Sequence, residues 1–240
     1  MSQPLSADQL AFYREQGYLD CGRVLATSAV DELRAIIDGF VASARKENVG
    51  LSAEAGKSYT LFTPVFTVAS RYEALVLQNP AILDILESIL GPVFRLLEDA
   101  MFFKPANHGA ALAYHHDNSY YGFPLDVPAV TCWIAIDDST LDNGCLRFVP
   151  GSHLQDTPHE QITGTVLTRA AVDESQVIDL PVPAGTVVIF DKLTIHGSGP
   201  NTTDRPRRAC NIVGVVPTVD SKLRHFDDTL NPYLRGGPAA

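Results

Sequence analysis

The sequence predicts a mainly β protein with flanking helices, organised around a double-stranded β-helix core of the jelly-roll or cupin type. From about residue 93 onward, short runs of β-branched and aromatic residues alternate with turns that contain Gly, Pro, Asn or Asp. Before that point, apolar residues recur at helical spacing. Because no repeat, low-complexity tract or linker divides the chain, we expect one domain over residues 1–240, mostly helical over 1–92 and with the jelly-roll core over 93–240.

Three helices are predicted in the first part of the chain. The first follows a capping box at Ser6, and the second begins near Ser28, where apolar residues recur with a helical period. The third is capped by Asn79 and ends at Gly91. The segment 48–70 is rich in Gly, Ser and Thr, and it is predicted to be a long ordered loop or lid.

Six strands are predicted in the remainder, separated by turn residues such as Asp142-Asn143-Gly144 and Pro150-Gly151. They cover Val93–Glu98, Ala100–Lys104, Ala129–Ile136, Cys145–Val149, Thr186–Phe190 and Ala209–Val216.

The composition is that of an ordinary globular protein and argues against several functional classes. The formal net charge of −10 at pH 7 disfavours a broad nucleic-acid-binding face. No apolar run reaches the roughly 18 residues that a membrane span needs. The N-terminus lacks the charged start and apolar stretch of a signal peptide, so we expect a cytoplasmic protein. The four cysteines show no CxxC spacing and are expected to be free thiols.

Two histidines and an aspartate form a candidate metal site. His115 and Asp117 are expected on one strand, where residues i and i+2 point to the same face and reach one metal ion. His196 lies 81 positions after His115, and a jelly roll can bring the two segments together. Two imidazoles and a carboxylate make the facial triad of non-haem Fe(II), although zinc or manganese also accepts these ligands. His116 should point the other way, behind the site or to the surface.

A basic cluster follows His196. Arg207 lies eleven positions after this histidine, and its planar guanidinium would match a carboxylate if it points into a pocket. If a strand begins here, Arg205 and Arg207 share one face while Arg208 faces away. Periodicity does not choose between Arg205 and Arg207, and a solvated basic turn is the alternative reading for each of them.

Several strings, taken together, resemble the phytanoyl-CoA dioxygenase superfamily. These strings are Phe12–Tyr18, Trp133–Asp138, Asn143–Leu146, Pro150–His153, His196–Asn201 and Arg205–Ala209. The likeness spans essentially the whole chain, and the motifs are specific in combination. It implies the jelly-roll fold and an Fe(II)- and 2-oxoglutarate-dependent dioxygenase, an oxidoreductase that consumes O2 and 2-oxoglutarate and releases succinate and CO2.

The resemblance also assigns roles to individual residues. His115, Asp117 and His196 would be the iron ligands and catalytic residues. Arg207 would hold the distal carboxylate of 2-oxoglutarate, with Ser198 beside it and Trp133 lining the same pocket. Family members that halogenate carry a small residue in place of the ligating aspartate, so the carboxylate here implies hydroxylation or a related oxidation. His153 lies in a turn that recurs in the family, and we interpret it as structural.

The expected partner is a small metabolite or natural-product intermediate with an unactivated C–H bond, and neither a nucleic acid nor a membrane. The composition gives no support for a coenzyme A thioester. The candidate substrate contacts are Tyr120, Tyr121, Phe123, Phe62 and Phe103. Two alternatives remain: a cupin-like metal-dependent isomerase or lyase that does not use 2-oxoglutarate, and a non-catalytic ligand-binding jelly roll.

Overall fold

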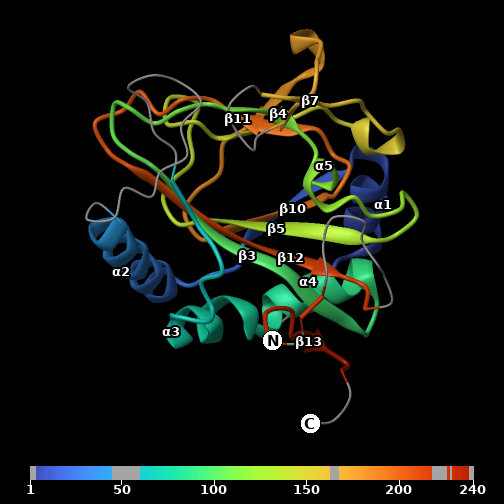
Figure 1. Cartoon of the computed structure of the whole chain (residues 1–240), viewed down its shortest axis with the longest axis horizontal. Coiled ribbons are helices and arrows are strands. Elements are labelled where there is room, and N and C mark those ends of the chain that lie inside the picture. The colour runs from blue at the N-terminus through green and yellow to red at the C-terminus, as the bar shows by residue number, and fades with distance from the viewer. Residues whose placement is uncertain (1–3, 45–59, 163–167, 218–225, 228, 238–240) are drawn as a thin grey trace.

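Two facing antiparallel sheets form the core of the protein in the computed structural model, which describes residues 4–44, 60–162, 168–217, 226–227 and 229–237 (Figure 1). The larger sheet has the strand order β1 (Tyr18–Arg23), β10 (Thr186–Asp191), β5 (Ala129–Ala135), β12 (Arg207–Val215), β3 (Phe94–Lys104) and β13 (Tyr233–Arg235), with β2 (Thr60–Phe62) paired to β3. The smaller sheet has the order β4 (Leu112–His115), β11 (His196–Ser198), β6 (Leu146–Phe148) and β9 (Ile178–Leu180). A separate pair joins β7 (Glu160–Gln161) and β8 (Thr168–Arg169). The predicted mainly β, jelly-roll architecture is confirmed.

The helices lie mostly on the outer face of the larger sheet (Figure 1). They are α1 (Ala7–Gln16), α2 (Thr27–Ala44), α3 (Ser70–Tyr72), the π-helical η1 (Glu73–Leu77), α4 (Pro80–Leu90), α5 (Asn118–Tyr121), and two short 3-10 helices, η2 (Ser152–Leu154) and η3 (Glu174–Gln176). The three helices predicted from the sequence correspond to α1, α2 and α4. Within the described part of the chain, no helix combines the length and apolarity that a membrane crossing requires.

The predicted helix ends follow from local hydrogen bonds. Ser6 and Gln9 form the capping box of α1, each side chain accepting the other residue's backbone N–H. Gly17 ends this helix with a φ of 82°, a conformation that favours glycine. The side chain of Asn79 accepts N–H groups at the start of α4.

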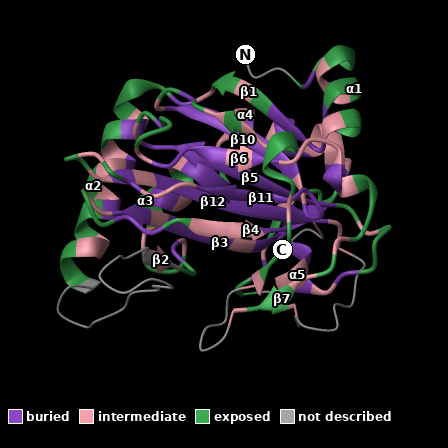
Figure 2. Ribbon diagram, turned by 90° about the horizontal axis from the view of Figure 1, so that it is seen from above, coloured by how far each residue is buried: buried purple, intermediate pink, exposed green. Residues whose placement is uncertain are grey.

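Alternation along β5 builds two separate cores from one apolar run. Cys132 and Ile134 pack in the core shared with α2 and α4, whereas Trp133 and Ala135 pack between the two sheets. Every residue of β5 is buried, as are most residues of its neighbours (Figure 2). The larger sheet is therefore covered on both faces, and its inner face looks toward the smaller sheet.

One predicted strand boundary is wrong. Val93–Glu98 and Ala100–Lys104 are not two strands but parts of the continuous strand β3. Asp99 between them is buried, and its carboxylate accepts the backbone N–H groups of Val65 and Phe66 at 2.8 and 3.0 Å. The polar residue is thus accommodated by hydrogen bonds from a neighbouring loop and does not interrupt the strand.

The first part of the chain contributes strands as well as helices. Strand β1 follows α1 directly and pairs with β10 at the edge of the larger sheet. In the segment 48–70, predicted to be a loop or lid, residues 48–59 lie outside the described residues, and the rest contains β2. The cysteines are free, as predicted.

Candidate metal centre

The two site histidines face each other across a strand pair. Strand β11 pairs antiparallel with β4, and His196 is the register partner of His115. Register partners carry their side chains on the same face of a sheet. The two imidazole centroids lie 4.4 Å apart. Two segments that are 81 positions apart in the sequence therefore meet at the predicted residues.

Gly197 allows the two strands to lie this close. A Cβ atom at this position would lie 2.9 Å from the carbonyl oxygen of Leu112 and 3.0 Å from the ring of Tyr114. The nearer neighbour is backbone of β4, which cannot rotate away. A side chain at position 197 would therefore push β11 from β4, together with the histidines that they carry.

Asp117 reaches the histidines by a route that differs from the predicted one. Strand β4 ends at His115, and Asp117 is the N-terminal cap of α5, with a helical φ of −62° and ψ of −30°. The expectation that His115 and Asp117 share one strand face is therefore wrong, because the chain turns between them. Thr131 on β5 donates a hydrogen bond to Oδ2 of Asp117 and leaves Oδ1 for the histidines.

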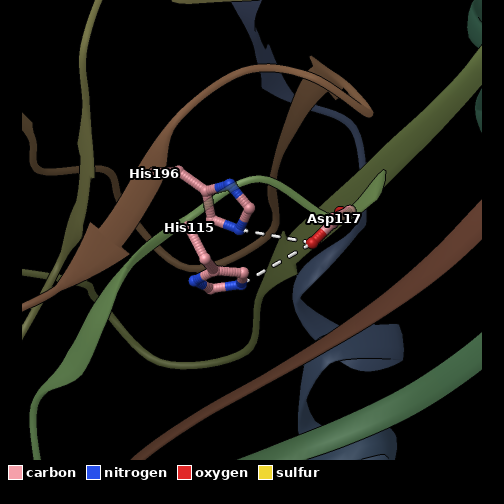
Figure 3. A group of neighbouring side chains, drawn as sticks. All are labelled: His115, Asp117 and His196. Carbon is pink, nitrogen blue, oxygen red and sulfur yellow. Dashed lines mark ion pairs between the residues drawn. The ribbon is translucent and has the colours of Figure 1, made fainter. Parts of the chain in front are cut away.

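The three side chains converge on one point (Figure 3). Oδ1 of Asp117 lies 3.7 Å from Nε2 of His115 and 3.6 Å from Nε2 of His196. One donor atom from each residue lies within 4.8 Å of the other two, and no residue of the three is more than 8% exposed. Two imidazole nitrogens and one carboxylate oxygen on one side of a point form the facial arrangement that divalent metals accept.

Backbone carbonyls hold both imidazoles in the tautomer that a metal ion requires. Nδ1–H of His115 donates to the carbonyl of Ala113 at 2.8 Å, and Nδ1–H of His196 donates to that of Thr194 at 3.0 Å. The Nε2 lone pairs therefore remain available on the inner side. Burial lowers the pKa of His115 to about 3 and that of His196 to about 4, so both rings are neutral near pH 7.

The charge of Asp117 completes the fit to a cation. Burial raises the pKa of this carboxyl group, and His115 and the hydrogen bond from Thr131 oppose that shift only in part. A divalent cation bound by all three residues would stabilise the carboxylate form. The donor set thus fits Fe(II), and its chemistry also admits zinc or manganese.

A cavity of about 280 Å³ adjoins the metal ligands. Besides the three ligands, its lining consists of Leu61, Thr63, Glu98, Phe102, Leu112, Tyr120, Tyr121, Trp133, Leu146, Phe190, Ser198, Arg207 and Asn211. The three residues predicted to contact the co-substrate, Ser198, Trp133 and Arg207, thus share one cavity with the predicted metal ligands.

The structure distinguishes between the two candidate arginines. Arg207 is 2% exposed, and its Nη2 donates to the carbonyl of Gly144 at 2.9 Å. Its guanidinium carbon lies 5.8 Å from the centroid of the Trp133 ring. The side chain of Arg205 is 89% exposed and lies outside the cavity lining. Only Arg207 can therefore present its guanidinium to a ligand in the cavity.

Lys104 is a second buried basic residue near Arg207, and the sequence patterns did not single it out. It is the register partner of Arg207 on β3, it is fully buried, and its Nζ donates to the carbonyl of Gly199. Burial, and then the charge of Arg207, lowers the pKa of Lys104 well below its usual range. A lysine at the end of an apolar strand was the available signal, because such a strand buries its alternate residues.

The structure separates the predicted substrate contacts into two groups. Tyr120 and Tyr121 line the cavity. Phe123 is buried but packs against Tyr121 outside the lining, and Phe103 lies on the other face of β3. Neither of these two residues lines the cavity, and on β3 the cavity residue is the neighbouring Phe102. The side chain of Phe62 lies outside the described residues.

His116 is neither a metal ligand nor a surface residue. It is 3% exposed, and its ring lies 4.0 Å from that of His159. His116 therefore points away from the ligands, as expected, and of the two positions considered for it, behind the site or at the surface, it occupies the first. His153, predicted to be structural, lies outside the cavity lining and makes a hydrogen bond to the carbonyl of Arg14 in the last turn of α1.

A model of the phytanoyl-CoA dioxygenase family, PhyH, matches residues 13–209 of the 240. The chain belongs to the phytanoyl-CoA dioxygenase family. The family resemblance seen in the sequence is thereby confirmed.

Relatives of this chain include other members of the phytanoyl-CoA dioxygenase family. A phytanoyl-CoA dioxygenase domain-containing protein 1 homolog of Caenorhabditis briggsae is 32% identical over 131 residues, which cover 49% of this chain and 45% of that protein. The ectoine dioxygenase of Bordetella bronchiseptica is 25% identical over 251 residues, 95% of this chain and 80% of that protein. The chain matches less than half the length of the domain-containing relatives from Caenorhabditis briggsae, Caenorhabditis elegans and Bos taurus.

Solved structures share the fold over almost the whole chain. The non-heme monooxygenase ThoJ in its apo form has a TM-score of 0.78 at 28% identity, covering 95% of this chain and 84% of that one. The epimerase SnoN from nogalamycin biosynthesis has a TM-score of 0.71 at 23% identity, covering 95% and 98%, and shares the fold.

Proposed function

We propose that this protein is an Fe(II)- and 2-oxoglutarate-dependent dioxygenase that oxidises, most simply hydroxylates, a C–H bond of a small molecule. One observation carries the proposal. The convergent donors of His115, Asp117 and His196 and the buried guanidinium of Arg207 line the same cavity. Metal ligands and a carboxylate-binding cation in one small cavity are what a chelating dicarboxylate requires.

Each residue has a defined role in this proposal. His115, His196 and Asp117 hold the metal ion, and Arg207 pairs with the distal carboxylate of 2-oxoglutarate, with the Ser198 hydroxyl beside it. Trp133, against which Arg207 packs, forms a wall that keeps water from the co-substrate. When bound, Fe(II) and 2-oxoglutarate together activate O2 for C–H oxidation and yield succinate and CO2.

Much of the remaining cavity wall is apolar or aromatic, with polar groups from Thr63, Glu98 and Asn211, and this supports a small reacting group with apolar surface. Leu61, Phe102 and Leu112 present apolar surface, and Tyr120 and Tyr121 add aromatic surface with hydroxyl groups. Asp117 occupies the carboxylate ligand position, which supports oxygen insertion or a related oxidation over halogenation. A coenzyme A group would have to remain outside a cavity of about 280 Å³.

Anaerobic titration tests the co-substrate part of the proposal. Adding 2-oxoglutarate to the Fe(II)-loaded protein should produce a visible metal-to-ligand charge-transfer band. Asp117→Ala and His196→Ala should abolish both the band and the release of succinate in air. Metal binding without such a band would favour an isomerase or lyase that does not use 2-oxoglutarate.

A substrate screen tests the oxidation itself. Small molecules that stimulate succinate release above the uncoupled background are candidates, and mass spectrometry of their products should show an added oxygen atom or a loss of two hydrogens. Tight binding of a candidate with no oxygen consumption would instead support a non-catalytic binding protein.

A further inference from the structure

A histidine pair supports the turn that joins two of the metal ligands. His116 stands between His115 and Asp117, and its backbone N–H donates to Nε2 of His159 at 2.9 Å. The ring of His116 lies 4.0 Å from that of His159, and its Nδ1 accepts the backbone N–H of Ser119 at 3.1 Å. The His159 ring is oriented in turn, because its Nδ1–H donates to the carbonyl of Thr157 at 2.8 Å.

The strand pair that follows His159 contacts α5, the helix directly after this turn, at two points. Thr168 on β8 donates its backbone N–H to the hydroxyl of Tyr120 at 3.1 Å. The hydroxyl of Thr168 lies 2.8 Å from that of Ser119. His159, which directly precedes β7, and Thr168 on β8 therefore hold the turn at His116 and the helix α5 that follows it.

This support matters because the backbone of Asp117 lies outside any strand, although Thr131 on β5 holds one oxygen of its carboxylate. His115 and His196 are register partners in paired strands, so the strand ladder sets their separation. Asp117 lies past the end of β4, and its place depends on the path of the backbone through residue 116. A hydrogen bond at the N–H of His116 acts on that path directly, between the two ligands.

We propose that His159 is a positioning residue that sets the geometry of the metal site through the backbone of His116. The inference rests on the proposed function, because it takes His115, Asp117 and His196 as metal ligands. Partners that orient metal ligands from outside typically change metal affinity by about 10- to 100-fold when they are removed. Among the described residues, the hydrogen bonds of the His159 ring go to the backbone of His116 and Thr157, neither of which lines the cavity, so its effect should reach the substrate through the metal.

Cobalt(II) binding to the full chain tests this inference without relying on turnover. The wild-type protein should bind Co(II) with a visible ligand-field spectrum, and failure of the wild type to bind would count against the proposed function. His159→Ala should weaken the Co(II) affinity by about 10- to 100-fold and shift the spectrum, while the thermal midpoint of the metal-free protein stays nearly unchanged.

Two further variants separate positioning from general stability. His159→Gln keeps a side-chain acceptor for the His116 N–H and should recover most of the affinity and the wild-type spectrum. His108→Ala replaces an exposed histidine and serves as the matched control. If His159→Ala binds Co(II) with wild-type affinity and spectrum, the inference is overturned. If His159→Ala does not fold, a folded His159→Gln variant with wild-type binding supports the inference, and one with the same affinity loss as Asp117→Ala overturns it.

Discussion

Arg207 is the residue on which the choice of co-substrate depends. Its guanidinium is buried against Trp133 at the cavity, whereas Arg205 extends into solvent two positions earlier. We expect Arg207→Met to weaken 2-oxoglutarate binding by about 30- to 150-fold, since a charge-assisted pair contributes about 2–3 kcal/mol. Binding of 2-oxopentanoate, which chelates the metal but lacks the distal carboxylate, should change little.

Calorimetric titration of the Ni(II)-loaded protein with both 2-oxo acids measures this difference. Arg205→Met removes the same charge from a residue outside the cavity and is the matched control. An equal loss of affinity for both 2-oxo acids in Arg207→Met would mean that Arg207 shapes the cavity but does not bind the distal carboxylate. A loss in Arg205→Met alone would assign the carboxylate contact to the other arginine.

At the scale of residues, the sequence predicted which side chains meet but not always how. His115 and His196 meet as expected from residue type and family motif. The predicted strand position of Asp117 was wrong, since period-two alternation does not indicate where a strand ends. The expectation that Phe103 lines the cavity failed for a similar reason. Which face of β3 borders the cavity depends on strand register, and the aromatic character of a residue does not reveal it.

At the scale of elements, the close approach of β11 to β4 determines the separation of the two histidines. We expect Gly197→Ala to destabilise the metal-free protein by about 1–3 kcal/mol, since the added Cβ would overlap the carbonyl of Leu112. Metal affinity should fall as well, because His196 moves with its strand. Urea unfolding and a Co(II) titration measure the two effects.

Gly199→Ala is the control for this prediction. A Cβ at Gly199 would have its nearest neighbour, the Cα of Gly144, at 3.8 Å, an ordinary contact distance. This variant should stay within about 0.5 kcal/mol of the wild type. If both alanine variants have the same stability and the same metal affinity, the close approach of β11 to β4 does not determine the geometry of the metal site.

At the scale of the whole molecule, the sequence predicted the elements with strong local signals. The capped helices α1 and α4 and the long apolar strands β5, β10 and β12 were recognised because their patterns are internal to each segment. Short strands such as β4, β11 and β13 carry too few residues for a period to be visible. Their pairing is decided by register across long sequence separations, which a single sequence does not display.

Folding as a whole should respond to pH through the neutral site histidines. The pKa of His196 is about 4 in the folded protein against 6.5 for an ordinary histidine, so the unfolded chain binds more protons between these values. The contribution of His196 to the free energy of unfolding is therefore fully present above pH 6.5 and is lost as the pH falls toward 4. For His196 alone, the linkage amounts to about 2 kcal/mol between pH 7 and pH 5.

The comparison that isolates this effect is between metal-free wild type and His196→Gln. Other groups titrate in the same range, and Asp117, with its raised pKa, acts in the opposite direction. Subtracting the variant's free energy of unfolding from that of the wild type at each pH removes contributions that both proteins share. The difference should decrease by about 2 kcal/mol from pH 7 to pH 5 in urea unfolding measured with a chelator present. A difference that stays constant over this range would mean that His196 is not held neutral by burial, and the proposed tautomer at the metal site would lose its support.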